Sequence, residues 1–284
     1  MRYIDWILPL NVKNTLKKYF QKEAPVVSKV EEKIEINPLL ERNKVLNNSV
    51  GENKTCYILA CGPSINEMDL SILKGEDCIS VSNFFVHPLY NEIQPKYHVF
   101  AQRHEPITEE QLVEWFKDFA AKTSFESKLI FSAKDFCSLE EVVNKGGIES
   151  YCYELTDELP ENFDQITFEN PIPRIQTVVH IAMYLAISLG YKEINLLGVD
   201  HDWLFHFGES RHFYKEKESK LNQKGYEEFH SENDLELQFK SHLLLWKVYK
   251  SIKRFSIEHE IQVFNLNMGS FLDVFPKKKI GNEV

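Results

Sequence analysis

The feature that most constrains the fold is a series of short apolar runs separated by longer, helix-like segments. The runs have the length and composition of buried strands and lie at 55–60, 78–82, 97–101, 128–132, 192–198 and 261–266. Between them, 109–121, 176–189 and 234–256 have the length and the apolar or amphipathic pattern of helices. This alternation predicts an α/β fold with an open, mostly parallel, Rossmann-like sheet flanked by helices.

The chain of 284 residues divides at about residue 54 into an arm and a domain. Residues 1–22 combine tryptophan and aliphatic side chains with four lysines, which suits a helix lying in a membrane interface. A helix packed on the domain or on a second subunit has the same pattern, so peripheral membrane contact and a homo-oligomer both stay open. Residues 23–54 are polar and contain two prolines, as in a linker or a loosely packed arm. Residues 55–284 form the predicted α/β domain.

Charge and cysteine content argue against two classes of protein. The 33 basic and 43 acidic residues give a net charge of −10. General nucleic-acid binding is therefore not expected, because it needs lysine and arginine to neutralise phosphates. The five cysteines form no CxxC pair, which favours reduced thiols over a zinc site. No apolar run reaches the roughly 18 residues of a membrane span. We expect a cytoplasmic protein, placed at the inner face of the cytoplasmic membrane if residues 1–22 bind there.

The turn after the first predicted strand is a candidate ligand site. Gly62 lets a ligand approach the backbone, Pro63 suits a first helical position, and Ser64 supplies a hydroxyl. Ser64 and Glu67 have the spacing of a capping box, which predicts a helix starting there. In an open parallel sheet, ligands bind beyond the carboxyl ends of the strands, where helix N-termini present N–H groups. Asn83 follows the second strand at that edge, so its amide is a candidate contact for a base, ribose or phosphate, or simply a turn cap.

Two later groups also lie at element ends. Arg174 and Thr177 stand at the start of the apolar helix, where a guanidinium and the helix dipole would attract a phosphate or carboxylate. Asp200, His201 and Asp202 directly follow the next strand. Their carboxylates could hold Mg²⁺ beside phosphates and the histidine could act as a base. The carboxylates could equally cap a loop or orient the histidine.

Residues 204–232 are polar, aromatic and rich in histidine without clear periodicity, which is typical of a long active-site loop or lid. Imidazoles, phenols and a guanidinium in such a lid would stabilise a leaving phosphate and supply a base near neutral pH. The candidates are His206, Arg211, His212, Tyr214, Tyr226 and His230. Their spacing does not specify a zinc site, and a solvated loop with incidental histidines has the same composition.

Separated stretches of this chain together resemble one family. They are 57–69 (YILACGPSINEMD), 82–85 (SNFF), 186–200 (AISLGYKEINLLGVD) and 229–234 (FHSEND). In order and approximate spacing they resemble the small bacterial sialyltransferases that decorate lipooligosaccharide, from about residue 55 to 276. The Gly-Pro-Ser and Gly-x-Asp-His features also resemble a broader group, which includes pterin pyrophosphokinase-like proteins and motility accessory factors associated with flagellin glycosylation.

The sialyltransferase resemblance implies a GT-A-related fold and a metal-independent, inverting transfer of an acidic sugar from a CMP-activated donor. Carried over residue by residue, it places Gly62 and Ser64 at the nucleotide. It places Asn83 at the nucleotide or its phosphate, and Arg174 with Thr177 at the donor. No cofactor is implied beyond the nucleotide-sugar substrate.

The same resemblance implies roles for the lid. His230 would be the general base that deprotonates the acceptor hydroxyl, and Tyr214 or Tyr226 would stabilise the leaving phosphate. We also expect Asp200 at the nucleotide and His201 among the catalytic groups.

The chain departs from the family pattern in three places. Cys61 stands where the family has asparagine, the lid tyrosines do not align cleanly, and residues 1–54 have no counterpart. The sequence thus predicts a glycosyltransferase of surface polysaccharide, capsule or lipooligosaccharide synthesis, with a sialic acid, Kdo or related acid as the sugar and a glycan or glycolipid as acceptor. One alternative is a Mg²⁺-dependent pterin pyrophosphokinase-like enzyme with Asp200 and Asp202 near the metal. Another is a noncatalytic accessory protein of glycan assembly that docks through its N-terminal helix.

Overall fold

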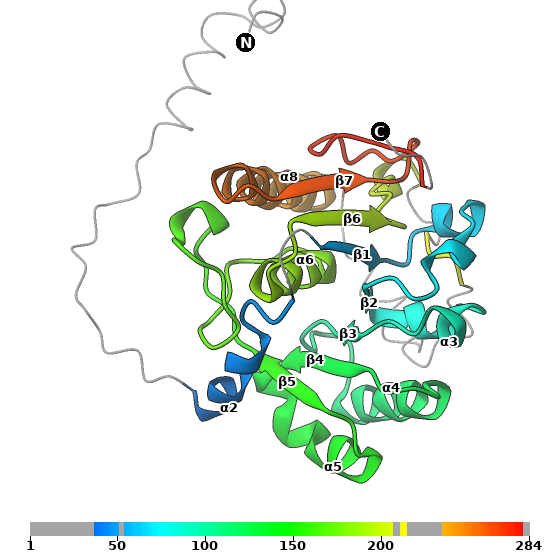
Figure 1. The fold of residues 1–284 in the computed structure, drawn as a ribbon, viewed down its shortest axis with the longest axis vertical. Coiled ribbons are helices and arrows are strands. Elements are labelled where there is room, and N and C mark those ends of the chain that lie inside the picture. Colours follow the sequence, from blue (N-terminus) through cyan, green and yellow to red (C-terminus); the bar gives the residue numbers. More distant parts are fainter. Residues whose placement is uncertain (1–36, 51–53, 207–210, 215–234, 281–284) are drawn as a thin grey trace, which may run out of the picture. The chain divides into compact units, whose positions relative to one another are not determined.

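The computed structural model describes residues 37–50, 54–206, 211–214 and 235–280. These residues form a seven-stranded sheet of order β5-β4-β3-β2-β1-β6-β7 in which every neighbouring pair is parallel (Figure 1). The strands are β1 (Thr55–Leu59), β2 (Cys78–Val81), β3 (Tyr97–Val99), β4 (Lys128–Ser132), β5 (Ser150–Tyr153), β6 (Glu193–Leu197) and β7 (Gln262–Asn265). The predicted α/β fold with a parallel sheet is confirmed.

Helices cover both faces of the sheet. The α-helices are α2 (Pro38–Glu41), α3 (Tyr90–Ile93), α4 (Glu109–Lys122), α5 (Phe136–Gly146), α6 (Val178–Leu189) and α8 (Leu235–Glu258). Short 3₁₀ helices are η2 (Arg42–Leu46), η3 (Pro63–Glu67), η4 (Leu70–Leu73), η5 (Ser82–Val86), η6 (Ala133–Asp135), η7 (Pro160–Asn162) and η8 (Trp203–Phe205). No helix among the described residues is long and apolar enough to cross a bilayer.

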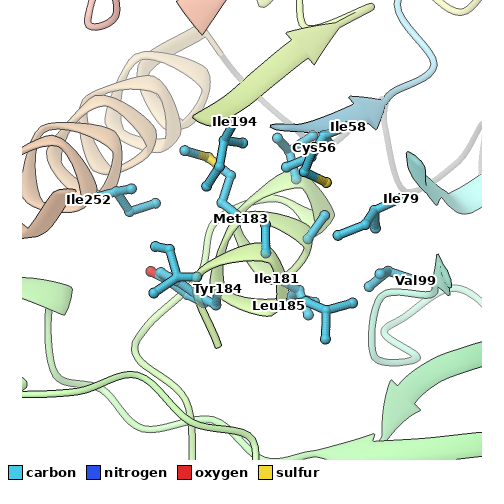
Figure 2. Packing of buried hydrophobic residues seen from close by; sticks show 14 of the residues in the cluster. Cys56, Ile58, Ile79, Val99, Ile181, Met183, Tyr184, Leu185, Ile194 and Ile252 are labelled. Carbon is cyan, nitrogen blue, oxygen red and sulfur yellow. The ribbon is translucent and has the colours of Figure 1, made fainter. Parts of the chain in front are cut away.

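One core lies between the sheet and helices α6 and α8 (Figure 2). Alternate residues of β1, such as Cys56 and Ile58, point toward α6, as the two-residue period of a strand requires. Ile181 and Met183 of α6 are completely buried against them. Burying a large aliphatic side chain stabilises the fold by about 1.5–3 kcal/mol. This packing fixes the N-terminus of α6 beside the carboxyl end of β1.

The other core is aromatic and lies between the sheet and helices α3, α4 and α5. Phe100, just after β3, packs edge-on against Trp115 of α4, with ring centroids 4.5 Å apart. Its ring is tilted by 30° against that of Phe116, with ring centroids 4.2 Å apart. A capping box between Thr108 and Gln111 starts α4. The aromatic side chains of the sequence are thus divided between the two cores.

The sheet has a topological switch point between β1 and β6. From β1 the chain proceeds outward through β2, β3, β4 and β5, and then returns through α6 to β6 on the other side of β1. The connections that follow β1 and β6 therefore leave in opposite directions. In open α/β sheets such a point leaves a crevice at the carboxyl ends of the two strands, where ligands bind.

Three local features differ from or add to the sequence predictions. Strand β5 and helix α5 were not predicted, and the helix predicted from Ser64 is only the 3₁₀ helix η3. Residues 37–50 pack on the folded unit, since Leu40 is buried and Asn43 donates to the carbonyls of Cys152 and Phe168, each at 2.6 Å. Arg42 donates to the carbonyl of Ser150, so this segment satisfies carbonyl groups of the edge strand β5. The predictions for residues 1–22, and for most of the lid at 204–232, lie outside the described residues.

Candidate functional site

A cleft of about 420 Å³ opens at the carboxyl ends of β1, β2, β3 and β6. Its walls come from five segments at the ends of the strands and at the start of α6, from α4 and the loop before it, from α8 and from the described part of the lid. They are 60–62, 81–83, 101–104, 176–179 and 198–203, together with Ile107, Leu112, Trp115, Arg211, His212, Tyr214, Ser241 and Leu245. The cleft thus occupies the switch point of the sheet and has the volume of a small-molecule site.

The turns after β1 and β6 touch backbone to backbone at the floor of the cleft. The Gly62 N–H donates to the Gly198 carbonyl at 2.8 Å. A Cβ atom on Gly62 would lie 2.5 Å from that carbonyl oxygen and 2.6 Å from Asp200 Oδ2. Gly62 has an ordinary φ of −65°, so close approach, and not backbone conformation, is what requires glycine here.

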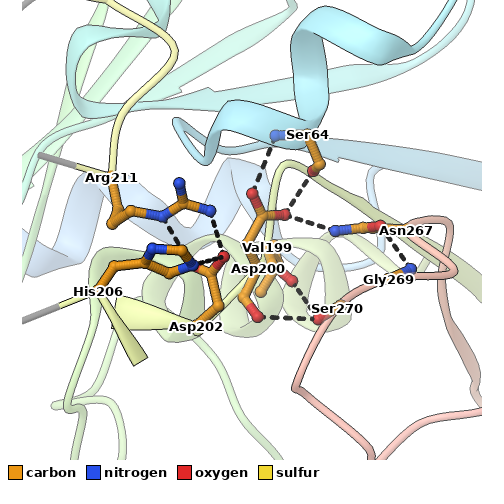
Figure 3. Close-up of polar contacts among 9 residues, drawn as sticks. All are labelled: Ser64, Val199, Asp200, Asp202, His206, Arg211, Asn267, Gly269 and Ser270. Atoms are coloured by element: carbon orange, nitrogen blue, oxygen red, sulfur yellow. Dashed lines mark hydrogen bonds and ion pairs between the residues drawn. The ribbon is translucent and has the colours of Figure 1, made fainter. Parts of the chain in front are cut away.

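Asp200 joins the β1 turn to the loop after β7 (Figure 3). Its carboxylate accepts from the Ser64 N–H at 3.0 Å, from the Ser64 hydroxyl, and from Asn267 Nδ2 at 2.7 Å. Its backbone carbonyl accepts from the Phe271 N–H at 2.9 Å. The Ser64 side chain is therefore committed to Asp200, and the predicted capping box with Glu67 does not form. Asp200 is buried and serves first to set the shape of the cleft floor.

Asn83 is held by the indole of α4. Trp115 Nε1 donates to Asn83 Oδ1 at 2.5 Å. Because an indole nitrogen is only a donor, this contact fixes which end of the amide faces the tryptophan. The neighbouring Cys61 donates its thiol to the Val81 carbonyl at 3.4 Å, and burial raises its pKa to about 12. Cys61 is thus a neutral packing residue and not a thiolate nucleophile.

Asp202 anchors the start of the lid (Figure 3). Arg211 donates to both of its carboxylate oxygens, from Nε at 3.2 Å and from Nη2. His206 Nε2 lies 3.8 Å from Asp202 Oδ2. A two-point contact between guanidinium and carboxylate restrains both side chains. Arg211 lines the cleft, so this contact places a guanidinium at its mouth.

The residues after Arg211 cross the β1 turn. The Phe213 N–H donates to the Cys61 carbonyl at 2.9 Å, and its ring packs edge-on against Phe84 at 5.9 Å. Tyr214 lines the cleft and stacks on His212 with ring centroids 5.0 Å apart. The lid is therefore fixed to the domain at this point, and it carries a phenol into the cleft.

His201 sits at the end of the cleft next to α8. Its backbone has a φ of +50°, and its Nε2 lies 2.8 Å from the hydroxyl of Tyr249. Burial lowers the pKa of His201 to about 4; His242 lowers it further and Asp202 opposes the shift. A histidine with that pKa is neutral at pH 7 and is a weak base.

The segment after β3 belongs to the site and was not singled out from the sequence. Gln102, Arg103 and His104 all line the cleft. The Arg103 N–H donates to Asp135 Oδ2 at 2.9 Å, and its guanidinium donates to the Ile107 carbonyl at 3.4 Å. Their position after the strand predicted at 97–101 was the available signal, because all parallel strands of one sheet end at the same edge.

The cleft brings together most of the predicted site residues. Those that line it are Gly62, Asn83, Thr177, Asp200, His201, Asp202, Arg211, His212 and Tyr214. Pro63 and Ser64 follow Gly62 in η3, and Ser64 reaches the site through Asp200. Arg174 is not among the lining residues; its backbone bonds to Glu158 and Tyr184. His230 and Tyr226 lie outside the described residues. Within the described residues, no group of three or more His, Cys, Asp or Glu side chains could hold a metal ion.

Comparison with solved structures finds the sialyltransferase CstII from Campylobacter jejuni. Its complex with cytidine-5′-monophosphate is 17% identical, with a TM-score of 0.44 over 80% of this chain and 86% of that one. Its complex with CMP-3FNeuAc is 17% identical, with a TM-score of 0.45 over 79% and 85%. Its complex with a trisaccharide acceptor and CMP is 17% identical, with a TM-score of 0.44 over 81% and 89%. No protein-family model matches the chain, and no curated protein matches it.

Proposed function

We propose that this chain is an inverting glycosyltransferase that transfers an acidic sugar from a CMP-activated donor to a hydroxyl of a glycan or glycolipid. The observation that carries the proposal is convergence. The stretches at 57–69, 82–85 and 186–200, which resemble the bacterial sialyltransferases, are far apart in the sequence, yet each contributes residues to one cleft. The cleft lies at the switch point of a parallel sheet, where nucleotide ligands bind.

The anionic part of the donor has a natural place at the N-terminus of α6. This helix has twelve residues, and its cap residue Thr177 makes no side-chain capping bond. Val178 and Val179 of its first turn line the cleft. First-turn N–H groups and the helix dipole together attract a phosphate or carboxylate. The nucleotide would then extend toward Asn83 and the Gly62 turn.

The reaction needs a base and a stabilised leaving group. The acceptor hydroxyl oxygen attacks the anomeric carbon on the face opposite the phosphate, so configuration inverts. The bond from that carbon to the phosphate oxygen breaks, and CMP leaves with the electron pair. The hydroxyl proton passes to the base, which the resemblance assigns to His230. Tyr214 and Arg211, both lining the cleft, supply donors for the charge that develops on the phosphate.

The pyrophosphokinase alternative has less support from the site. It needs carboxylates turned toward Mg²⁺, but Asp200 accepts from Ser64 and Asn267, and Asp202 is bound by Arg211. Both carboxylates would have to leave these donors before they could coordinate a cation. We therefore propose that the transfer requires no metal ion.

The cellular setting follows from the proposed reaction. We propose a role in surface-glycan synthesis, such as lipooligosaccharide or capsule, at the cytoplasmic face of the membrane. Residues 1–22 would supply peripheral membrane contact.

The experiment is a release assay for CMP. Purified protein is incubated with CMP-activated sialic acid or Kdo and a panel of glycan acceptors, with EDTA or with Mg²⁺. We expect acceptor-dependent release of CMP that EDTA does not reduce. His230→Ala should abolish this release, whereas the control His259→Ala, directly after the last residue of α8, should retain it. Metal-dependent transfer from ATP to a pterin, or full activity of the His230 variant, would contradict the proposal.

A further inference from the structure

The end of the cleft next to α8 differs in chemistry from the rest. It is lined by His201, Trp203, Ser241 and Leu245. Behind these residues α8 packs further aromatic rings: His242 lies 3.8 Å from Trp203 between ring centroids. The charged pair at this end, Asp202 with Arg211, is joined by two hydrogen bonds. Apart from this pair, the described residues that line this end are a neutral imidazole, an indole, a hydroxyl and an aliphatic side chain.

The hydrogen bond between His201 and Tyr249 fixes the tautomer of the histidine. Tyr249 is completely buried, and burial raises the pKa of its phenol well above the usual value. Its hydroxyl makes one hydrogen bond to the described residues, to His201 Nε2. If Nε2 carried the proton, the buried phenolic hydrogen would have no acceptor there, which is costly. The phenol therefore donates to Nε2, and the proton of the imidazole lies on Nδ1.

The surroundings keep this imidazole neutral. On the α6 side stand His180, whose ring meets that of Tyr249 edge-on at 4.2 Å, and Tyr184, which interacts electrostatically with Tyr249. On the α8 side stands His242, and beside His201 stands Asp202, which is already paired. Burial holds the pKa of His180 well below its ordinary value, and it also lowers the pKa of His242.

A neutral donor next to an indole suits an uncharged sugar. The Nδ1 of His201 makes no hydrogen bond to the described residues, although the residue lines the cleft. Trp203 contributes a large, weakly polar ring of the kind that packs against the carbon face of a pyranose. Anionic groups are better placed at the N-terminus of α6, where the helix dipole favours them.

We propose that the α8 end of the cleft is the subsite for an uncharged ring of the acceptor glycan, in which His201 donates from Nδ1 to a sugar oxygen and Trp203 packs against the ring. Only the statement that the bound sugar belongs to the acceptor rests on the proposed function. In it, Tyr249 is a positioning residue that acts through His201. His201 is thereby a hydrogen-bond donor to the substrate and not the base of the reaction.

The direct test is ¹⁵N NMR of histidine-labelled, full-length protein, with the signals assigned from the spectrum of His201→Asn. We expect His201 to show a protonated Nδ1 throughout pH 5.5–8, and we expect its Nδ1 signal to shift when lactose, a neutral probe, is added with CMP. Glucose 6-phosphate should leave that signal unshifted. A protonated Nε2, a titration midpoint near 6.5, or a response to the phosphate alone would overturn the proposal.

Variants give a second readout. Asparagine places an amide nitrogen near the position of Nδ1 and tolerates a positive φ, so His201→Asn should retain lactose binding. His201→Ala and Tyr249→Phe should weaken lactose binding roughly 3- to 10-fold, the size of one neutral hydrogen bond. CMP affinity should stay unchanged in all three, and His259→Asn is the matched control. If the unsubstituted protein does not bind CMP, that result counts against the proposed function alone. If His201→Ala binds lactose as tightly as the unsubstituted protein, that result counts against this subsite.

Discussion

The contact between the turns after β1 and β6 can be tested with Gly62→Ala. The added Cβ would lie 2.5 Å from the Gly198 carbonyl oxygen, about 0.9 Å short of an ordinary contact of 3.4 Å, and 2.6 Å from Asp200 Oδ2. Neither neighbour is the end of a flexible side chain that can swing away. The carbonyl belongs to the backbone and accepts the Gly62 N–H, and the carboxylate is held by Ser64.

The substitution should therefore part the two turns. Overpacking of a close contact costs about 1–3 kcal/mol. For a domain of this size each kcal/mol lowers the melting temperature by roughly 2–4 °C. Because the turns form the cleft floor, we also expect a loss of CMP affinity of at least about tenfold, as a misplaced binding group gives.

The matched control is Gly75→Ala. Gly75 has a φ of +87°, but a Cβ there would meet no atom within 4 Å. Alanine in that conformation costs roughly 1 kcal/mol through backbone strain. This control should lower the melting temperature while leaving CMP affinity unchanged. Differential scanning calorimetry and isothermal titration of CMP measure both quantities, and a Gly62→Ala protein that melts and binds like the unsubstituted protein would refute the packing argument.

Two further substitutions follow from the site and the core. Ser64→Ala removes a hydroxyl that donates to buried Asp200, so it should destabilise the protein by about 1.5–3 kcal/mol in urea unfolding. Ser71→Ala, at an exposed position of the 3₁₀ helix η4, should change the free energy of unfolding by less than about 0.5 kcal/mol. Burial lowers the pKa of His98 to about 3, so the unfolded chain binds its proton first as the pH falls below about 6.5, and stability present above that pH is lost on acidification. Near pH 5 the free energy of unfolding should therefore fall less steeply with decreasing pH in His98→Gln than in the unsubstituted protein, by about 1.4 kcal/mol per pH unit. If the two proteins show the same dependence on pH, His98 is protonated in the folded protein.

The sequence located the strands that contain a run of aliphatic side chains or phenylalanine and missed the one that has none. Strand β5 consists of serine, tyrosine, cysteine and tyrosine, a composition that apolar runs do not reveal. Its burial depends on Arg42 and Asn43, which reach its carbonyls from more than one hundred residues earlier. Such pairing is invisible to any local pattern.

The same contrast between local sequence patterns and contacts of distant residues applies to the site. The sequence placed Asn83 and Asp200 after predicted strands of a parallel sheet, and in the structure both line the cleft at that edge. The partner of Ser64 did not follow, because a local capping pattern competed with a carboxylate 136 residues away. The hydrogen bond between His201 and Tyr249 did not follow either, because the sequence assigned Tyr249 only to a long amphipathic helix.

The most direct test of the central claim is ligand stabilisation. The melting temperature of the full-length protein is measured with CMP, CDP, UMP, GDP and ATP, each with Mg²⁺ and with EDTA. A ligand present at one hundred times its dissociation constant adds about 2.7 kcal/mol to the free energy of unfolding and so raises the melting temperature. We predict that, of these five nucleotides, only CMP raises the melting temperature by such an amount, and that EDTA does not reduce the increase. Stabilisation by ATP that appears only with Mg²⁺, with none by CMP, would contradict the account.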